Sequence, residues 1–89
     1  MFYVVVYDIV SDKVRNKVLK ILQRYGYRVQ YSVVECELNK ASLLRVSKEI
    51  KKVIDKKTDK VFFYPLDEKN RKNILFLGKH SFSKNCIIL

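Results

Sequence analysis

The first eight residues constrain the fold of this chain more strongly than any other segment. Residues 2–7 form an uninterrupted run of valine, phenylalanine and tyrosine, and the first charged residue is Asp8. Such a run is typical of a strand near the centre of a sheet. Side chains alternate along a strand, so the even-numbered residues of the run face one side of the sheet and the odd-numbered residues the other. Both faces of this strand therefore need to be covered.

A helix and two strands are predicted to follow. Ser11 is suited to cap a helix that runs to about Tyr25, with Gly26 as its stop. Residues 27–38 then alternate in character, which indicates a short strand followed by another, with a break near Glu35.

The second half of the chain repeats this order. Asn39 or Ser42 is predicted to cap a second helix that ends near Lys56. Residues 60–64 form a strand that the next residue, a proline, closes, and residues 74–78 form an additional strand after a charged loop. The order β-α-β-β-α-β predicts an α+β fold, the ferredoxin-like two-layer sandwich.

We expect one domain, with residues 1–66 as its core and residues 67–89 as a C-terminal extension that contains an extra strand. Two helices cover only one face of a sheet, yet both faces of the strands are apolar. We therefore predict a homodimer whose sheets pack face to face, with a strand of the extension added to the partner's sheet. The alternative is a monomer with scattered exposed aromatic side chains.

The charge of the chain points to a polyanionic partner. Lysine and arginine number 19 against 9 acidic residues, a formal net charge of +10. This balance favours nucleic acid over an anionic membrane. The two cysteines form no CxxC motif, and the apolar start lacks the features of a signal peptide. We expect a cytoplasmic protein with no membrane partner.

Much of this charge falls at helical spacing, in two basic stripes. The first predicted helix carries Lys13, Lys17, Lys20 and Arg24, and the second carries Arg45, Lys48, Lys52 and Lys56. Residues at intervals of three and four lie on one side of a helix. Ordinary solvated helix faces usually mix charges of both signs, so we expect at least one stripe to contact the phosphates of nucleic acid.

Asp8 ends the first strand and is a candidate metal ligand. Its carboxylate could instead organise the turn into the first helix through Ser11. As a ligand it suits Mg²⁺, which prefers carboxylate oxygens and keeps waters that serve in hydrolysis. In a face-to-face dimer, two Asp8 side chains could meet across the two-fold axis and share a cation. Helical spacing places Arg15 near the end of the same strand.

Several short motifs together resemble the CRISPR-associated protein 2 family over residues 1–66. The motifs are Tyr7-Asp8, Arg15-Asn16-Lys17, Arg24-Tyr25-Gly26, residues 28–33 (Arg-Val-Gln-Tyr-Ser-Val) followed by Glu35 and Glu37, and Tyr64-Pro65-Leu66. Two positions depart from the usual pattern: Val34 stands where the family has phenylalanine, and Lys17 where some members have arginine.

The resemblance implies a ferredoxin-like homodimer at the core of a complex with two dimers of CRISPR-associated protein 1, the integrase of spacer acquisition. In that assembly the smaller protein spans a DNA duplex. The resemblance also implies a magnesium-dependent endonuclease acting on single-stranded RNA or double-stranded DNA. Asp8 would be the metal ligand, with Tyr7, Arg15 and Arg28 as catalytic residues around it.

Three other functions stay open at this point. The protein could be a non-catalytic scaffold between DNA and integrase, or a small toxin-like ribonuclease. It could also be an RNA-binding module that uses Tyr3, Phe62 or Tyr64 as stacking platforms. His80, the only histidine, is predicted to lie at the surface or on an edge strand.

Overall fold

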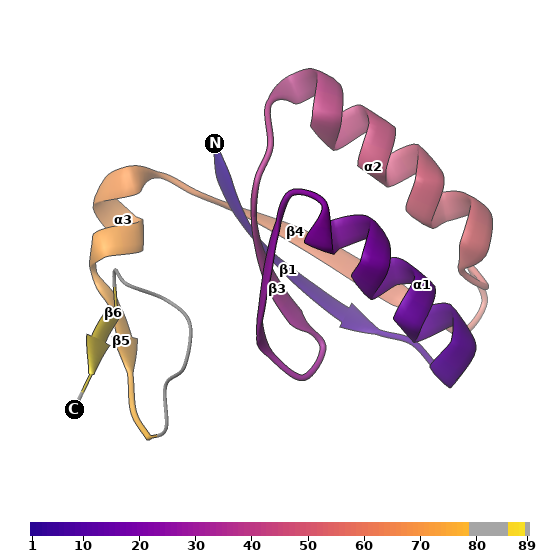
Figure 1. The fold of residues 1–89 in the computed structure, drawn as a ribbon, viewed down its shortest axis with the longest axis horizontal. Coiled ribbons are helices and arrows are strands. Elements are labelled where there is room, and N and C mark those ends of the chain that lie inside the picture. Colours follow the sequence, from indigo (N-terminus) through magenta and orange to yellow (C-terminus); the bar gives the residue numbers. More distant parts are fainter. Residues whose placement is uncertain (79–85, 89) are drawn as a thin grey trace.

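Four antiparallel strands form one sheet in the order β2-β3-β1-β4, and two long helices cover one face of it (Figure 1). This is a computed structural model, and it describes residues 1–78 and 86–88. The elements are β1 (Phe2–Asp8), α1 (Asp12–Gln23), β2 (Gly26–Gln30), β3 (Val33–Glu37), α2 (Lys40–Val53), β4 (Lys60–Leu66), α3 (Glu68–Lys72), β5 (Ile74–Phe76) and β6 (Cys86–Ile88).

The topology is the ferredoxin-like arrangement that the sequence predicts. β1 lies inside the sheet and pairs antiparallel with β3 on one side and β4 on the other. The odd-numbered residues of β1 face the helices, since Val5 and Tyr7 are buried against them. Val18 and Leu22 of α1 close this core from above, and so do the buried side chains of α2. We call this side of the sheet the helix-covered face.

The opposite side, which we call the open face, has no long helix over it. The register of β1 with its two neighbours assigns it these apolar side chains: Phe2, Val4, Val6, Val33, Phe62, Tyr64 and Leu66. Phe62 and Tyr64 are 49% and 52% exposed and stack on each other with ring centres 5.9 Å apart. The structure therefore confirms that both faces of β1 are apolar. The face-to-face homodimer stays a prediction.

Two details between α1 and β3 differ from the sequence-based expectation. Gly26 does not end the helix, because α1 stops at Gln23 and Gly26 is the first residue of β2. A Cβ at this position would overlap the carbonyl group of Glu35 on β3, so glycine permits two strands to approach closely. The predicted break near Glu35 is wrong as well, because Glu35 lies in the middle of β3.

The chain instead reverses at Tyr31 and Ser32. Ser32 has a positive φ of 68°, as tight hairpin turns require, and the strand register shifts between Arg28 and Gln30. No glycine or asparagine marks this turn, which is why residue types alone did not predict it.

The second helix begins as expected and ends earlier. Asn39 caps α2 and forms a reciprocal capping box with Ser42. The helix ends at Val53, three residues before the predicted end. Pro65 does not close the last strand but lies within β4, which tolerates it because β4 is an edge strand of the sheet.

The C-terminal extension begins with a short helix where a loop was predicted. α3 follows β4, and β5 is shorter than the predicted strand over residues 74–78. β5 and β6 pair parallel with each other as a separate two-stranded sheet, so addition of a strand to a partner's sheet stays a prediction. His80 lies outside the described residues. Within residues 1–78 and 86–88, no helix has the length and apolar character needed to cross a membrane.

Candidate functional site

Asp8 occupies the end of the open face. It is the last residue of β1, is paired in register with Lys60 of β4, and is exposed. Its even-numbered position places it on the same side of the sheet as Val4 and Val6. In the part of the chain that the structure describes, its carboxylate has no hydrogen-bond or ion-pair partner. The carboxylate is therefore available to a ligand outside its own chain.

The other three predicted catalytic residues gather on the helix-covered side. Tyr7 is 3% exposed, and burial raises the pKa of its phenol, while the charges of Arg28 and Arg15 act to lower that pKa. Arg28 is in register with Val34 and is exposed at the edge of the sheet. Because Tyr7 and Asp8 are consecutive in a strand, their side chains point to opposite faces. One chain thus brings Tyr7, Arg15 and Arg28 together, but not around Asp8.

Arg15 makes three contacts next to the end of β1. Its guanidinium donates one hydrogen bond to the carbonyl oxygen of Ile9 (3.0 Å) and another to Asp12 (2.5 Å). The bond to Asp12 is the main cause that raises the pKa of Arg15. The guanidinium also lies 5.5 Å from the ring centre of Tyr31, at the tip of the β2–β3 turn. Arg15 therefore braces the backbone directly after Asp8.

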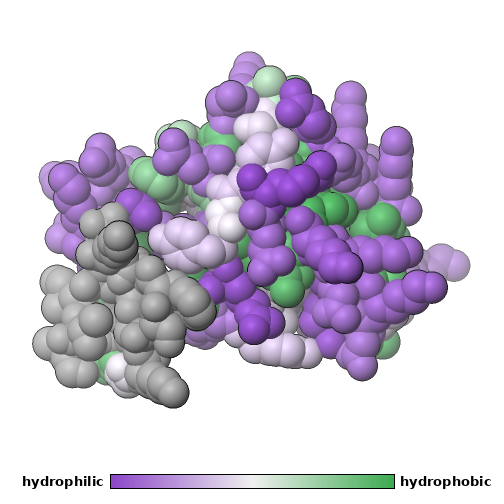
Figure 2. All heavy atoms as spheres, viewed as in Figure 1, coloured by the Kyte–Doolittle hydropathy of each residue, from purple (hydrophilic) through white to green (hydrophobic). Residues whose placement is uncertain are grey.

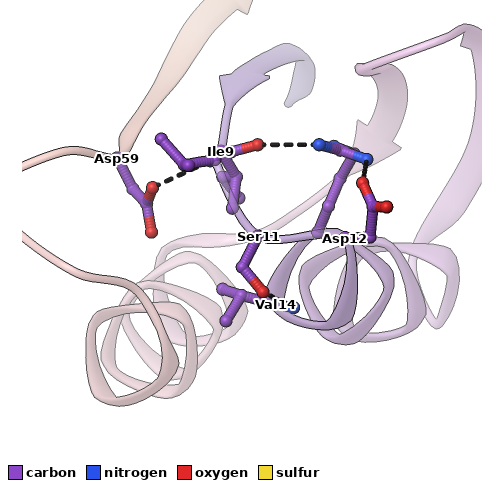
Figure 3. A network of polar contacts seen from close by, with 7 residues as sticks. Ile9, Ser11, Asp12, Val14 and Asp59 are labelled. Carbon is purple, nitrogen blue, oxygen red and sulfur yellow. Dashed lines mark hydrogen bonds and ion pairs between the residues drawn. The ribbon is translucent and has the colours of Figure 1, made fainter.

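The turn into α1 does not depend on Asp8. The Ser11 hydroxyl caps α1 by accepting a hydrogen bond from the Val14 N–H (3.3 Å). The carboxylate that holds the loop is instead Asp59, which accepts a hydrogen bond from the Val10 N–H (3.1 Å, Figure 3). Reasoning from the sequence missed Asp59, because this contact joins residues 49 positions apart.

No cluster of metal ligands surrounds Asp8 in the part of the chain that the structure describes. Among the described residues there is no group of three or more histidine, cysteine, aspartate or glutamate side chains placed to hold a metal ion. Asp8 offers an exposed carboxylate to which none of the described residues is bonded. The buried Cys36 is no candidate, since burial raises the pKa of its thiol to about 11. A cation at Asp8 would need further ligands, such as waters or groups of another molecule.

The predicted basic stripes lie on the surface of both long helices, except that Arg24 is the C-cap of α1 and Lys56 lies beyond the end of α2. Figure 2 shows hydrophilic residues dominating the surface over α1 and α2. Every stripe residue is exposed, but Arg24 is engaged in an ion pair with Glu49 that joins the two helices. Arg45 donates a hydrogen bond to the Tyr25 hydroxyl (3.4 Å). The lysines of the stripes have no ion-pair partner within the described residues, so their charges face solvent.

These features define a small basic protein of ferredoxin-like fold with an exposed aspartate at the end of its central strand. The chain belongs to the family described as CRISPR associated protein Cas2, whose model matches residues 1–74. The family resemblance found in the motifs is thereby confirmed.

Individual relatives agree with this assignment. The chain is 44% identical over 80 residues to "CRISPR-associated endoribonuclease Cas2 3" of Thermodesulfovibrio yellowstonii, an alignment covering 88% of this chain and 90% of that protein. It matches the crystal structure of Streptococcus pyogenes Cas2 with a TM-score of 0.73 and 34% identity, covering 76% and 88% of the two chains. A chain of a partial Cas6-RT-Cas1–Cas2 complex matches with a TM-score of 0.65 and 27% identity, covering 94% and 84%.

Proposed function

We propose that this protein is a nucleic-acid-binding subunit of CRISPR spacer acquisition that works beside Cas1 and also cleaves RNA at a site containing Asp8. The observation that carries the proposal is the exposed strand-end carboxylate of Asp8 in a chain of the Cas2 family. Relatives that are named endoribonucleases support the cleavage, and the structural match to a chain in a Cas1–Cas2 complex supports the partner.

Backbone binding rests on the lysines of the two helices. Lys13, Lys17 and Lys20 on α1 are exposed, as are Lys48 and Lys52 on α2. Flexible lysines without an ion-pair partner bind phosphates with little dependence on sequence. This property suits a subunit that holds a duplex of any sequence while an integrase acts on its ends.

The open face favours a second copy of this chain as its occupant. Its apolar side chains continue along three neighbouring strands, and Phe62 and Tyr64 are half exposed in the single chain. Most oligomers of one chain are two-fold dimers. Asp8 shares this face, so a face-to-face dimer could bring two Asp8 carboxylates toward the same axis, where a cation would relieve their repulsion.

This pair of carboxylates would complete the magnesium site that one chain lacks. When bound, Mg²⁺ supplies an activated water and neutralises charge on the phosphoryl oxygens. Asp8 would hold the ion. The exposed Arg28 lies on the helix-covered side, so it would bind the substrate's backbone away from the ion. Arg15 keeps the strand end in place, because its donors already bond to Ile9 and Asp12.

The RNA-recognition alternative loses part of its basis. Tyr3 is in register with Cys36 on the helix-covered face and packs edge-to-face against Phe63, with ring centres 6.4 Å apart. It is therefore not an exposed platform. Only Phe62 and Tyr64 could serve, and a second copy on the open face would cover both.

Charge reversal on α2 tests the binding surface. We expect Lys48→Glu with Lys52→Glu to weaken binding of a DNA duplex and to flatten its salt dependence, because log Kd depends on log salt with a slope of about 0.9 per phosphate contacted. Fluorescence anisotropy between low and physiological salt measures this slope. The matched control is Lys69→Glu with Lys72→Glu on α3, which we expect to leave the slope unchanged. Equal slopes for both double variants would place the duplex elsewhere on the molecule.

A further inference from the structure

We infer that Asp59 is a positioning residue that holds the backbone directly after Asp8, an inference that rests on the proposed role of Asp8 in cleavage. Asp59 is 8% exposed and directly precedes β4. Its side chain points toward the connection between β1 and α1 (Figure 3).

Both oxygens of this carboxylate are used. Oδ1 accepts hydrogen bonds from the Val10 N–H (3.1 Å) and the Thr58 hydroxyl (3.2 Å). Oδ2 accepts one from the Asp55 N–H (2.9 Å). The carboxylate thus joins the β1–α1 connection to the turn between α2 and β4. Since both oxygens are bonded within the chain and the residue is buried, Asp59 is poorly placed to act as a metal ligand itself.

This contact continues the pairing of β1 with β4 beyond the last residue of the sheet. Asp8 and Lys60 are the final pair in the register, and the contact between Asp59 and Val10 comes next. From another direction, Arg15 donates to the Ile9 carbonyl oxygen, and the Ile9 side chain is 3% exposed. The backbone after Asp8 is therefore held at two successive residues, while the Asp8 carboxylate stays exposed.

The charge on Asp59 is stabilised by these same bonds. The N–H groups of Asp55 and Val10, in that order, hold the pKa of the Asp59 carboxyl below its usual value. The carboxylate is thus ionised at neutral pH, the form that accepts all three hydrogen bonds. A small displacement of a catalytic group is costly for rate, whereas substrate binding along distant lysines does not depend on it.

The test compares Asp59→Ala with Asp55→Ala. The Asp55 carboxylate accepts a bond only from the Lys57 N–H (2.9 Å) among the described residues, so its loss disturbs the same turn without freeing Val10. For cleavage of single-stranded RNA with Mg²⁺, we expect Asp59→Ala to lower kcat by about tenfold or more and to leave KM near the wild-type value. We expect Asp55→Ala to keep the wild-type kcat. Hydrogen exchange of the Val10 amide, followed by NMR, should accelerate only in Asp59→Ala.

A conservative variant separates positioning from folding. Asp59→Asn keeps one carbonyl oxygen, so we expect it to restore Val10 protection and most of kcat together, even if Asp59→Ala folds poorly. An unchanged kcat in Asp59→Ala, or a loss of kcat in Asp59→Asn despite a protected Val10 amide, would overturn the inference. If wild-type protein does not cleave RNA, the proposed function is wrong. Hydrogen exchange of the Asp8 and Val10 amides then still tests whether Asp59 holds the backbone after Asp8. Unchanged exchange in Asp59→Ala would then refute it.

Discussion

Replacing Asp8 with asparagine is expected to abolish magnesium-dependent cleavage of single-stranded RNA and to leave folding and duplex binding intact. The amide has the same shape but lacks the charge that a hard cation requires. The Asp8 side chain is exposed and has no partner in the described residues, so stability should change little. Cleavage by highly purified protein measures the first effect, and thermal unfolding with duplex affinity measures the second. Asp55→Asn, also an exposed aspartate, is the control and should cleave normally.

The same variant separates scaffold from nuclease. If holding the duplex is the primary role in spacer acquisition, Asp8→Asn should support spacer integration as well as wild-type protein does. Loss of integration by a variant that still folds and binds duplex would contradict a scaffold role independent of Asp8. Cleavage of RNA by Asp8→Asn at the wild-type rate would show that Asp8 is not part of the active site.

Removing Arg71 is expected to destabilise the fold by about 3 kcal/mol, because it leaves the Glu35 carboxylate buried without a counter-charge. Glu35 lies on the open face, in register with Val4, and its side chain is only 6% exposed. The Arg71 guanidinium donates to it through Nε (2.6 Å) and lies 3.9 Å from the ring centre of Phe2. This one side chain thus anchors α3 to the sheet.

Urea unfolding of Arg71→Met measures this effect. The control is Lys72→Met on the same helix. Lys72 forms an exposed ion pair with Glu68 at 3.8 Å, so we expect its loss to lower the free energy of unfolding by less than about 0.5 kcal/mol. Adding Glu35→Gln to Arg71→Met removes the unpaired charge and should recover much of the loss. Equal stability of Arg71→Met and Lys72→Met would show that the Glu35 pair contributes nothing.

Local patterns predicted the elements better than the contacts between them. The apolar run of residues 2–7 and the caps Ser11 and Asn39 all appear in the structure. The sequence predicts Gly26 as a helix stop, because glycine is common after the last residue of a helix. In the structure, glycine is required at this position because a Cβ would overlap the carbonyl group of Glu35 on the neighbouring strand. That requirement becomes visible only once the two strands are placed side by side.

The site follows the same division. The position of Asp8 at the end of a buried strand was predictable, and so was the place of Arg15 beside it. Strict alternation along β1 also separates Tyr7 from Asp8, because consecutive side chains in a strand point to opposite faces. Asp59 could not be found, because its function depends on a partner 49 residues away. Whether two Asp8 side chains meet depends on a second molecule, which no single chain can specify.

Subunit mixing tests the shared site most directly. Wild-type protein, which should sediment near twice 10.6 kDa, is mixed with an equal amount of Asp8→Asn and allowed to exchange subunits. If each site needs both carboxylates of a two-fold dimer, the cleavage rate per total protein should be about one quarter of the wild-type rate, since random pairing leaves only that share of intact dimers. A rate of about one half would mean that each chain acts alone, which would contradict an active site built from two copies.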